Sequence, residues 1–337
     1  MEIIEIKDGS TAKIEQAAQI IDKGGLLAFP TETVFGLGAS IDNLEAVKRI
    51  YEVKGRSYQK PLSIHVADIE TARKYVKEIP PEAELLIERF IPGPLMLVLE
   101  KNDNVPDMIT AGSRKVGIRI PSNEAFTSLA KSCQNTIVAT SANRSGYFSP
   151  VNKNHVISDL GEVIDGILID EENMPLGIES TVIDFTVRPF RALRSGFINY
   201  DEISDVIGKN LLFSGDADLS RIKRTKSDMQ IIVLEAEKEK ILPVMKNMYL
   251  KFNAERTGKV GVLVTDGSEE VLSGVSNIKV MGSRNEPEMI SRNFFSCLRS
   301  FEKEEIEIII VEGISRKGVG WAVMDRLCGM ASEVIKL

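Results

Sequence analysis

Two short stretches place cations and polar groups where they could bind the same anion. In KGR, Lys54 and Arg56 lie two residues apart behind a predicted helix, so an ammonium and a guanidinium can converge on phosphate or carboxylate oxygens. In SANRSG, Ser141 and Asn143 follow an apolar run and offer a hydroxyl and an amide to phosphate oxygens or a nucleobase edge. Together these residue types indicate an anion or nucleotide site.

Three further stretches place polar groups at predicted strand ends. In FPTETVFGLG, Thr31 and Thr33 follow an apolar run, and we expect them to form polar walls of a pocket, with glycines allowing a close backbone approach. In SRKVGIRIP, Arg119 lies among Val116, Ile118 and Ile120, so a buried guanidinium needs an anionic partner, either a ligand or a protein carboxylate. The third stretch, GIESTVIDF with the following RALRSGFI, contributes Ser180, Arg191 and Arg194.

Each of these features has a plainer explanation when taken alone. Lys54 and Arg56 are also typical of a solvated surface pair, and His65 lies in a strand pattern that suits a core histidine. Their joint occurrence favours one shared cleft, because ligands collect at strand ends in open α/β sheets. The chain has neither GxxxxGK[ST] nor GxGxxG, so neither a P-loop nor a dinucleotide fingerprint explains the pattern.

Alternating helical and strand patterns must position these residues. In the first part, helices are predicted over Ala12–Asp22, from cap Asn43 to Val53 and from cap Asp68 to Val76. The predicted strands are Leu26–Phe29, Leu62–Val66, Leu95–Leu99, Val116–Ile120, Thr136–Ala139, Gly166–Ile169, Ser180–Asp184 and Phe190–Arg194. Several strands follow one another without a long helix between them, which predicts a twisted mixed sheet.

The rest of the chain predicts a second, smaller domain. Strands at Gln230–Leu234, Lys259–Thr265, Asn277–Met281 and Ile306–Val311 alternate with helices at Glu237–Asn253, Glu286–Ser300 and Val319–Ile335. This order predicts a doubly wound, Rossmann-like parallel sheet. The stretch FSGDADLSRIKRTKSD has no apolar period, so the predicted organisation is a catalytic domain over 1–208, a linker over 209–228 and a C-terminal domain over 229–337.

Composition limits the class of protein. A chain of 337 residues with 43% hydrophobic and 27% charged residues is typical of two globular domains. Without an apolar run of about 18 residues or a secretory signal, we expect a cytoplasmic protein that does not enter a membrane. Three widely spaced cysteines and two histidines argue against a disulfide framework and a protein-liganded metal site. The net charge of −7 disfavours extensive nucleic-acid contacts but allows a local basic groove.

Read together, the motifs resemble the YrdC-like family. PTETVFGLG, KGR with KPLSIHV, PGPLMLVL, VGIRIP, SANRSG, ESTVIDF and LRSGFI occur in the family's order over Lys23–Ile198. The segment IIIVEGISRKGVGWAVMDRL is similar to the C-terminal domain of the long, two-domain threonylcarbamoyl-AMP synthases. The resemblance implies that threonine, bicarbonate or CO2, and ATP form threonylcarbamoyl-adenylate and pyrophosphate. It also implies Mg²⁺ accompanying ATP, and tRNA and a separate threonylcarbamoyl transferase as partners.

The resemblance also implies roles for nine residues. It assigns Lys54, Arg56, Ser141 and Asn143 to catalysis and ATP binding, Arg194 to ATP binding, and Thr31, His65, Arg119 and Ser180 to threonine binding. Phe35, Met96 and Asn123 depart from the family pattern, which leaves open a relative that adenylates another carbamate. A non-catalytic RNA-binding protein is the alternative from another class.

Two basic segments each allow two interpretations. The predicted linker lacks the family's Pro-Gly-Met and His-Tyr elements, and its cations Arg221, Lys223, Arg224 and Lys226 suit either contacts to phosphate or RNA or a solvated linker. Gly318 and Gly320, beside Arg316 and Lys317, suit either an anion at a helix N-terminus or a tight loop.

Overall fold

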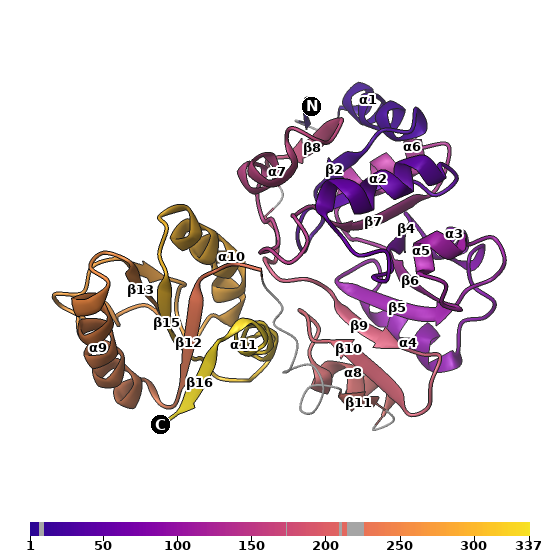
Figure 1. Cartoon of the computed structure of the whole chain (residues 1–337). Helices are drawn as coiled ribbons and strands as arrows, with labels where there is room; N and C mark the ends of the chain where they lie inside the picture. The colour runs from indigo at the N-terminus through magenta and orange to yellow at the C-terminus, as the bar shows by residue number, and fades with distance from the viewer. Residues whose placement is uncertain (7–9, 173, 209–210, 214–225) are drawn as a thin grey trace. The chain divides into compact units, whose positions relative to one another are not determined.

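The computed structural model describes residues 1–6, 10–172, 174–208, 211–213 and 226–337. The chain forms two compact units, Met1–Ser145 with Ser149–Ser214, and Gly146–Phe148 with Gly215–Leu337. Each unit is built around its own sheet (Figure 1), one mixed and one parallel. The predicted α/β fold class, with a mixed sheet followed by a smaller doubly wound sheet, is therefore confirmed.

The described residues of the first unit contribute eleven strands to one mixed sheet, in the order β1-β8-β2-β3-β7-β4-β6-β5-β9-β10-β11. The strands are β1 (Glu2–Ile6), β2 (Leu27–Phe29), β3 (Gly36–Ser40), β4 (Ser63–His65), β5 (Leu95–Glu100), β6 (Lys115–Arg119), β7 (Ile137–Ser141), β8 (Gly166–Asp170), β9 (Thr181–Asp184), β10 (Phe190–Arg194) and β11 (Leu211–Phe213). The helices are α1 (Thr11–Asp22), α2 (Leu44–Lys54), α3 (Ile69–Arg73), α4 (Pro81–Phe90), α5 (Asp107–Thr110), α6 (Glu124–Ser132), α7 (Lys153–Leu160) and α8 (Tyr200–Ile207).

The two faces of this sheet are covered to different extents. One face carries a continuous core that runs from Leu37 and Val138 to Ile118 and Ile183. On the other face, apolar residues of α1 and α6 pack over β2 and β7, where they bury Phe29 and Ile137. Because successive residues of a strand point to opposite faces, Ser63 and His65 of β4, Arg119 of β6 and Asp184 of β9 lie on this second face, where the His65 ring contacts Phe29 of that smaller core. The site described below occupies this part of the sheet.

Local signals account for the predicted helices. The side chain of Asn43 accepts a hydrogen bond from the Ala46 amide at 3.0 Å, and Gly55, with φ of 58°, ends α2 in the left-handed region. Asp68 caps α3 through the Thr71 amide at 2.7 Å. However, α3 ends at Arg73 rather than at Val76, because Val76 forms a β-bridge with Lys101.

The second unit contains a parallel sheet in the order β14-β13-β15-β12-β16. Its elements are β12 (Gln230–Glu235), α9 (Lys238–Glu255), β13 (Val260–Val264), β14 (Ile278–Val280), α10 (Pro287–Lys303), β15 (Ile308–Glu312), α11 (Val319–Met330) and β16 (Glu333–Lys336). Neighbouring parallel strands must be joined by crossover connections, and helices provide them here. In Figure 1, α9 lies on one side of the sheet and α10 and α11 lie on the other.

One predicted element in this unit is wrong. The helix expected over Val319–Ile335 ends at Met330, and Glu333–Lys336 forms strand β16 beside β12. The reason is a tertiary contact: the Ser332 amide donates to Ile231 O at 2.8 Å, which starts the pairing of the β-branched Val334 and Ile335 with β12.

The predicted linker over 209–228 falls largely outside the described residues. Arg221, Lys223 and Arg224 lie outside them, whereas Lys226 is described and exposed. The boundaries 1–208, 209–228 and 229–337 therefore stay a prediction. Within the described part of the chain, none of the helices has the length and apolar character needed to cross a membrane.

Candidate active site

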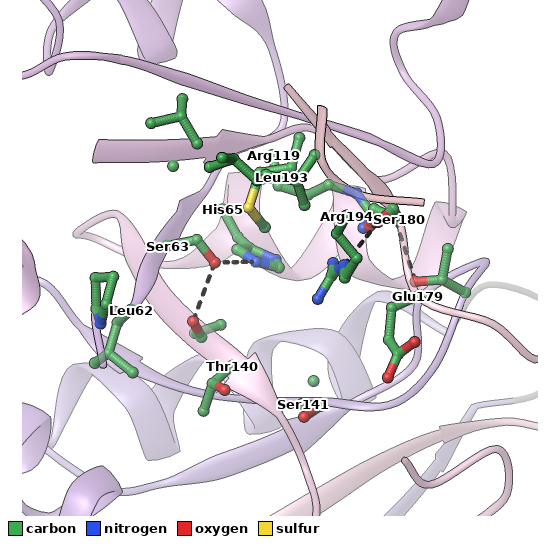
Figure 2. A pocket seen from close by; sticks show the side chains of 18 of the residues that line it. Leu62, Ser63, His65, Arg119, Thr140, Ser141, Glu179, Ser180, Leu193 and Arg194 are labelled. Carbon is green, nitrogen blue, oxygen red and sulfur yellow. Dashed lines mark hydrogen bonds between the residues drawn. The ribbon is translucent and has the colours of Figure 1, made fainter. Parts of the chain in front are cut away.

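A cavity of about 520 Å³ lies on the partly open face of the larger sheet (Figure 2). Strand pairing arranges its floor in two rows. His65, Arg119, Met96, Val182 and Arg194 form the first row, each directly opposite the next across β4, β6, β5, β9 and β10. Ser63, Gly117, Val98 and Asp184 form the second row, two residues away along β4, β6, β5 and β9, and Ala139 of β7 continues this row opposite Ser63. Neighbouring strands therefore bring together side chains that are far apart in the sequence.

Arg119 is held by a protein carboxylate. Its Nη2 donates to Glu32 Oε1 at 2.7 Å and to Thr33 Oγ1 at 3.3 Å. Both side chains of the ion pair are largely buried, with 4% of Arg119 and 13% of Glu32 exposed. Glu32 is therefore a protein carboxylate partner of the buried guanidinium, one of the two kinds of partner that the sequence left open. The Arg119 Nε has no hydrogen-bond partner among the described residues.

His65 is a neutral group in the cavity floor. One ring nitrogen, Nε2, lies 3.1 Å from Ser63 Oγ, whereas Nδ1 has no hydrogen-bond partner among the described residues. Burial, and secondarily the charge of Arg119, lowers the pKa of His65 to about 3. Phe29 and Phe126 make edge contacts with the ring. At neutral pH the imidazole is therefore a fixed hydrogen-bonding group and carries no charge.

The threonines after β2 line the cavity but also build their own loop. Thr31 Oγ1 donates to Val34 O at 2.6 Å and lies 2.9 Å from Thr33 Oγ1. The following glycines serve the fold: a Cβ at Gly36 or Gly38 would lie 2.5 or 2.9 Å from the nearest atom of the Phe29 ring. The close approach at these two glycines is therefore made by side chains of the neighbouring strands, which are Phe29 of β2 and, at Gly38, also Ile137 of β7.

The KGR and SANRSG stretches meet at the end of β7. The Lys54 ammonium is buried and donates to the backbone carbonyls of Ser141 and Asn143. Burial, followed by the charge of Arg56, holds the pKa of Lys54 well below its usual value. Ser141 Oγ donates to Asn143 Oδ1 at 2.5 Å. Of these residues, Ser141 and Arg56 line the cavity, whereas Lys54 and Asn143 are not among the described residues that line it.

Two arginines complete the cavity wall. Arg56 donates from Nη2 to Pro61 O at 2.8 Å and from Nε to Lys60 O at 3.2 Å. Arg194 donates from Nε to Ser180 O at 2.9 Å, and the Ser180 hydroxyl is buried without a hydrogen-bond partner among the described residues. Figure 2 shows His65 and Arg194 facing the open space that Thr140 and Ser141 border.

The structure adds residues that the sequence interpretation did not assign to the site. Lys115 and Asp184 form an ion pair at 2.8 Å in the cavity wall. Burial works to raise the pKa of Asp184, but hydrogen bonds from Lys115 and Thr186 outweigh it, so the pKa lies below its usual value. Gly117 in the floor has no side chain, which lets Met96 and Ser63 pack closely beside it. The sequence could have indicated Lys115 and Gly117, because alternate residues of a strand share one face and Arg119 lies on the same strand.

The departures from the family pattern occupy defined positions. Asn123 accepts a hydrogen bond from the Phe126 amide at 2.8 Å and caps α6, whereas Phe35 and Met96 line the cavity.

In the second unit, the basic segment before α11 is held by local contacts, and Arg316 pairs with Glu235 at 2.5 Å. At Gly320 a Cβ would lie 2.2 Å from Ser315 O, so the glycine allows a tight loop there. Both observations favour the tight-loop interpretation of that basic segment. Within the described residues, no group of three or more His, Cys, Asp or Glu side chains could hold a metal ion.

The fold and this cavity define an α/β protein that presents arginines and a neutral histidine on a partly open sheet face, an arrangement that suits an anionic ligand. A family model described as "Telomere recombination", which covers the Sua5, YciO and YrdC proteins, matches residues 19–196. A second model, described as "Threonylcarbamoyl-AMP synthase, C-terminal domain", matches residues 222–332. The chain belongs to the Sua5/YciO/YrdC family.

Individual relatives match nearly the whole chain. A protein of Pyrococcus abyssi named threonylcarbamoyl-AMP synthase is 40% identical, over 94% of this chain and 93% of the relative. A Bacillus subtilis protein of the same name is 35% identical, over 94% and 92%. A solved structure described as P. abyssi Sua5 complexed with L-threonine is similar at a TM-score of 0.93, with 36% identity and all of both chains covered.

Proposed function

We propose that this chain is a threonylcarbamoyl-AMP synthase, which converts L-threonine, bicarbonate or CO2, and ATP into L-threonylcarbamoyladenylate and pyrophosphate. The observation that carries the proposal is the grouping of Arg56, Arg119 and Arg194 around one cavity that also contains the neutral His65. Such a cavity suits the two anions that this reaction must bring together. The names of the relatives and the threonine-bound state of one of them support the same activity.

The proposed site divides into two parts. Arg119 binds the threonine carboxylate, with Thr31, His65 and Ser180 as polar neighbours in the same cavity. Arg56, Ser141 and Arg194 bind ATP, and Lys54 and Asn143 support that part from the β7 loop. The Ser180 hydroxyl and His65 Nδ1, both buried, offer hydrogen bonds that no described residue uses. These two groups support the placement of a polar substrate beside Arg119.

The proposed chemistry needs positioning more than a protein nucleophile. The threonine amine adds to CO2 and loses a proton to solvent, or condenses with bicarbonate and releases water, and either route gives a carbamate. A carbamate oxygen then attacks the α-phosphorus of ATP while the bond between that phosphorus and the oxygen that bridges it to the β-phosphorus breaks. Pyrophosphate leaves with the electron pair of that bond. Arginines that neutralise the carbamate and the phosphates lower the barrier by orientation and electrostatic stabilisation.

Mg²⁺ is proposed to arrive with ATP, where it neutralises phosphate charge. Glu179 and Asp184 are carboxylates that line the cavity, and Asp184 is already paired with Lys115.

The adenylate is an activated carbamoyl donor, so a separate transferase would consume it and pass the threonylcarbamoyl group to tRNA. The proposed location is the cytoplasm.

Pyrophosphate release tests the proposal. With ATP, Mg²⁺ and bicarbonate, release should require L-threonine and should be abolished by Arg56→Ala. The matched control is Arg188→Ala, which removes an exposed arginine of the same unit that pairs with Glu82. Release that does not depend on threonine would favour a relative that adenylates another carbamate. No release, together with salt-sensitive RNA affinity, would favour an RNA-binding protein.

A further inference from the structure

Glu32 occupies an unusual position relative to the proposed site. It does not line the 520 Å³ cavity, and lines instead a second cavity of about 600 Å³ together with residues of α1 and α6. Its Oε1 nevertheless reaches Arg119, which does line the first cavity, at 2.7 Å. The Glu32 carboxylate therefore reaches the proposed site through the guanidinium that it holds.

The contact fixes Arg119 strongly, because little water surrounds it. With 4% and 13% of the two side chains exposed, solvent screens their attraction less than it screens a surface pair. Thr33 Oγ1 accepts a second hydrogen bond from the same Arg119 nitrogen at 3.3 Å. Both anchors belong to the loop after β2, so this loop sets the orientation of the guanidinium.

The remaining donors of Arg119 indicate what this orientation serves. Its Nε is buried without a hydrogen-bond partner among the described residues, which is costly for a guanidinium unless an anion completes the set. Arginine suits carboxylates because it presents several N–H groups in a fixed plane. His65, opposite Arg119 in the sheet, is neutral and does not compete as a cation.

We propose that Glu32 is a positioning residue: it holds the Arg119 guanidinium through Nη2 so that the Nε–H receives the substrate carboxylate, without contacting the substrate itself. The inference rests on the proposed function, which supplies L-threonine as the carboxylate ligand. It adds to the proposed site a residue whose effect passes entirely through Arg119.

Glu32→Gln tests the effect on substrate affinity. The amide keeps a similar shape and loses the charge, so we expect the dissociation constant for L-threonine to rise about tenfold and that for ATP to change by less than about twofold. Glu82→Gln, which removes one partner of the exposed pair with Arg188, is the control and should change neither. An equal loss of affinity for both substrates would overturn the inference.

A double-substitution cycle tests whether the effect passes through Arg119. In an Arg119→Gln background, Glu32→Gln should cause no further loss of threonine affinity, whereas additive losses would overturn the inference. Urea unfolding of each variant establishes that it is folded.

A spectroscopic measurement separates this inference from the proposed function. With arginine labelled at ¹⁵Nε, the resonance lost in Arg119→Gln identifies Arg119. We expect it to be sharp and slowly exchanging in the wild type and to broaden in Glu32→Gln. An unchanged resonance overturns the positioning role even if the enzyme is active. If wild-type release of pyrophosphate does not depend on threonine, the proposed function fails, and the resonance still decides whether Glu32 positions Arg119.

Discussion

The ring of Phe29 fills the space that a side chain at Gly36 would occupy. The two residues are directly paired across β2 and β3, and a Cβ at Gly36 would lie 2.5 Å from Phe29 Cε2. Phe29 in turn makes an edge contact with His65 in the cavity floor, with ring centroids 6.2 Å apart. The glycine after the threonine loop therefore supports the site indirectly, by admitting the ring that packs against its histidine.

Gly36→Ala should consequently destabilise the first unit. The new methyl group would have to displace a fully buried ring, and overpacking of this kind costs about 1–3 kcal/mol. Urea unfolding measures the loss. In a Phe29→Leu background the smaller side chain leaves room, so the same Gly36→Ala change should cost less. An equal cost in both backgrounds would refute the explanation.

His65 should make the stability of the protein depend on acidic pH. Its pKa is about 3 in the folded chain, against the ordinary histidine value of 6.5 that applies to the unfolded chain, so below pH 6.5 the unfolded state binds a proton that the native state does not. Stability is therefore lost as pH falls from 6.5 toward 3, by about 1.4 kcal/mol per pH unit for this one group. Urea unfolding of the wild type and of His65→Gln between these pH values measures the difference. Parallel pH profiles of the two proteins would contradict the prediction.

Gly117 should set the depth of the cavity. A Cβ there would lie 3.0 Å from Met96 Sδ and 3.3 Å from Ser63 Cβ, so the flexible methionine can yield to a small side chain. We expect Gly117→Val to lower kcat/KM for threonine-dependent pyrophosphate release by at least about tenfold, because the branched side chain fills the floor.

The control for Gly117→Val is the same change combined with Met96→Ala. If lost depth is the cause, removing the neighbouring side chain should restore part of kcat/KM, and urea unfolding should show that both variants are folded. No recovery in the double variant would argue that the valine acts in another way, such as distortion of β6.

Local signals in the sequence were sufficient for much of this architecture. Asn43 and Asp68 cap helices as predicted, since a cap depends on residues only a few positions away. Strand β3 was not predicted, because GLGAS is buried throughout and has neither alternation nor β-branched residues. Its stability as a strand comes from pairing with β2 on one side and β7 on the other.

The site shows the same division between local and long-range information. The sequence required a partner for a buried Arg119 but could not identify it, because Glu32 lies 87 residues away and meets it only in the folded sheet. Likewise, the pairing of Lys115 with Asp184 spans 69 residues. Residue types therefore predicted polar and cationic groups at these strand ends, whereas strand order determined which of them line one cavity.

Lys54 should hold the β7 loop in place. Lys54→Met keeps the length of the side chain but removes the donor that the buried carbonyls of Ser141 and Asn143 share. Each unsatisfied buried group costs about 1–3 kcal/mol, so the loop should open more often. The Ser145 amide, which donates to Lys54 O at 2.8 Å, reports this opening through hydrogen exchange.

We expect the Ser145 amide of Lys54→Met to exchange at least about tenfold faster than that of the wild type, while amides in α9 of the second unit keep their rates. Lys48→Met is the matched control, because Lys48 lies on the same helix, α2, and is exposed, with 48% of its side chain accessible. It should leave the Ser145 amide unchanged. If Lys54→Met abolished pyrophosphate release with no change in that exchange rate, Lys54 would act on the substrate directly instead of through the loop that carries Ser141 and Asn143.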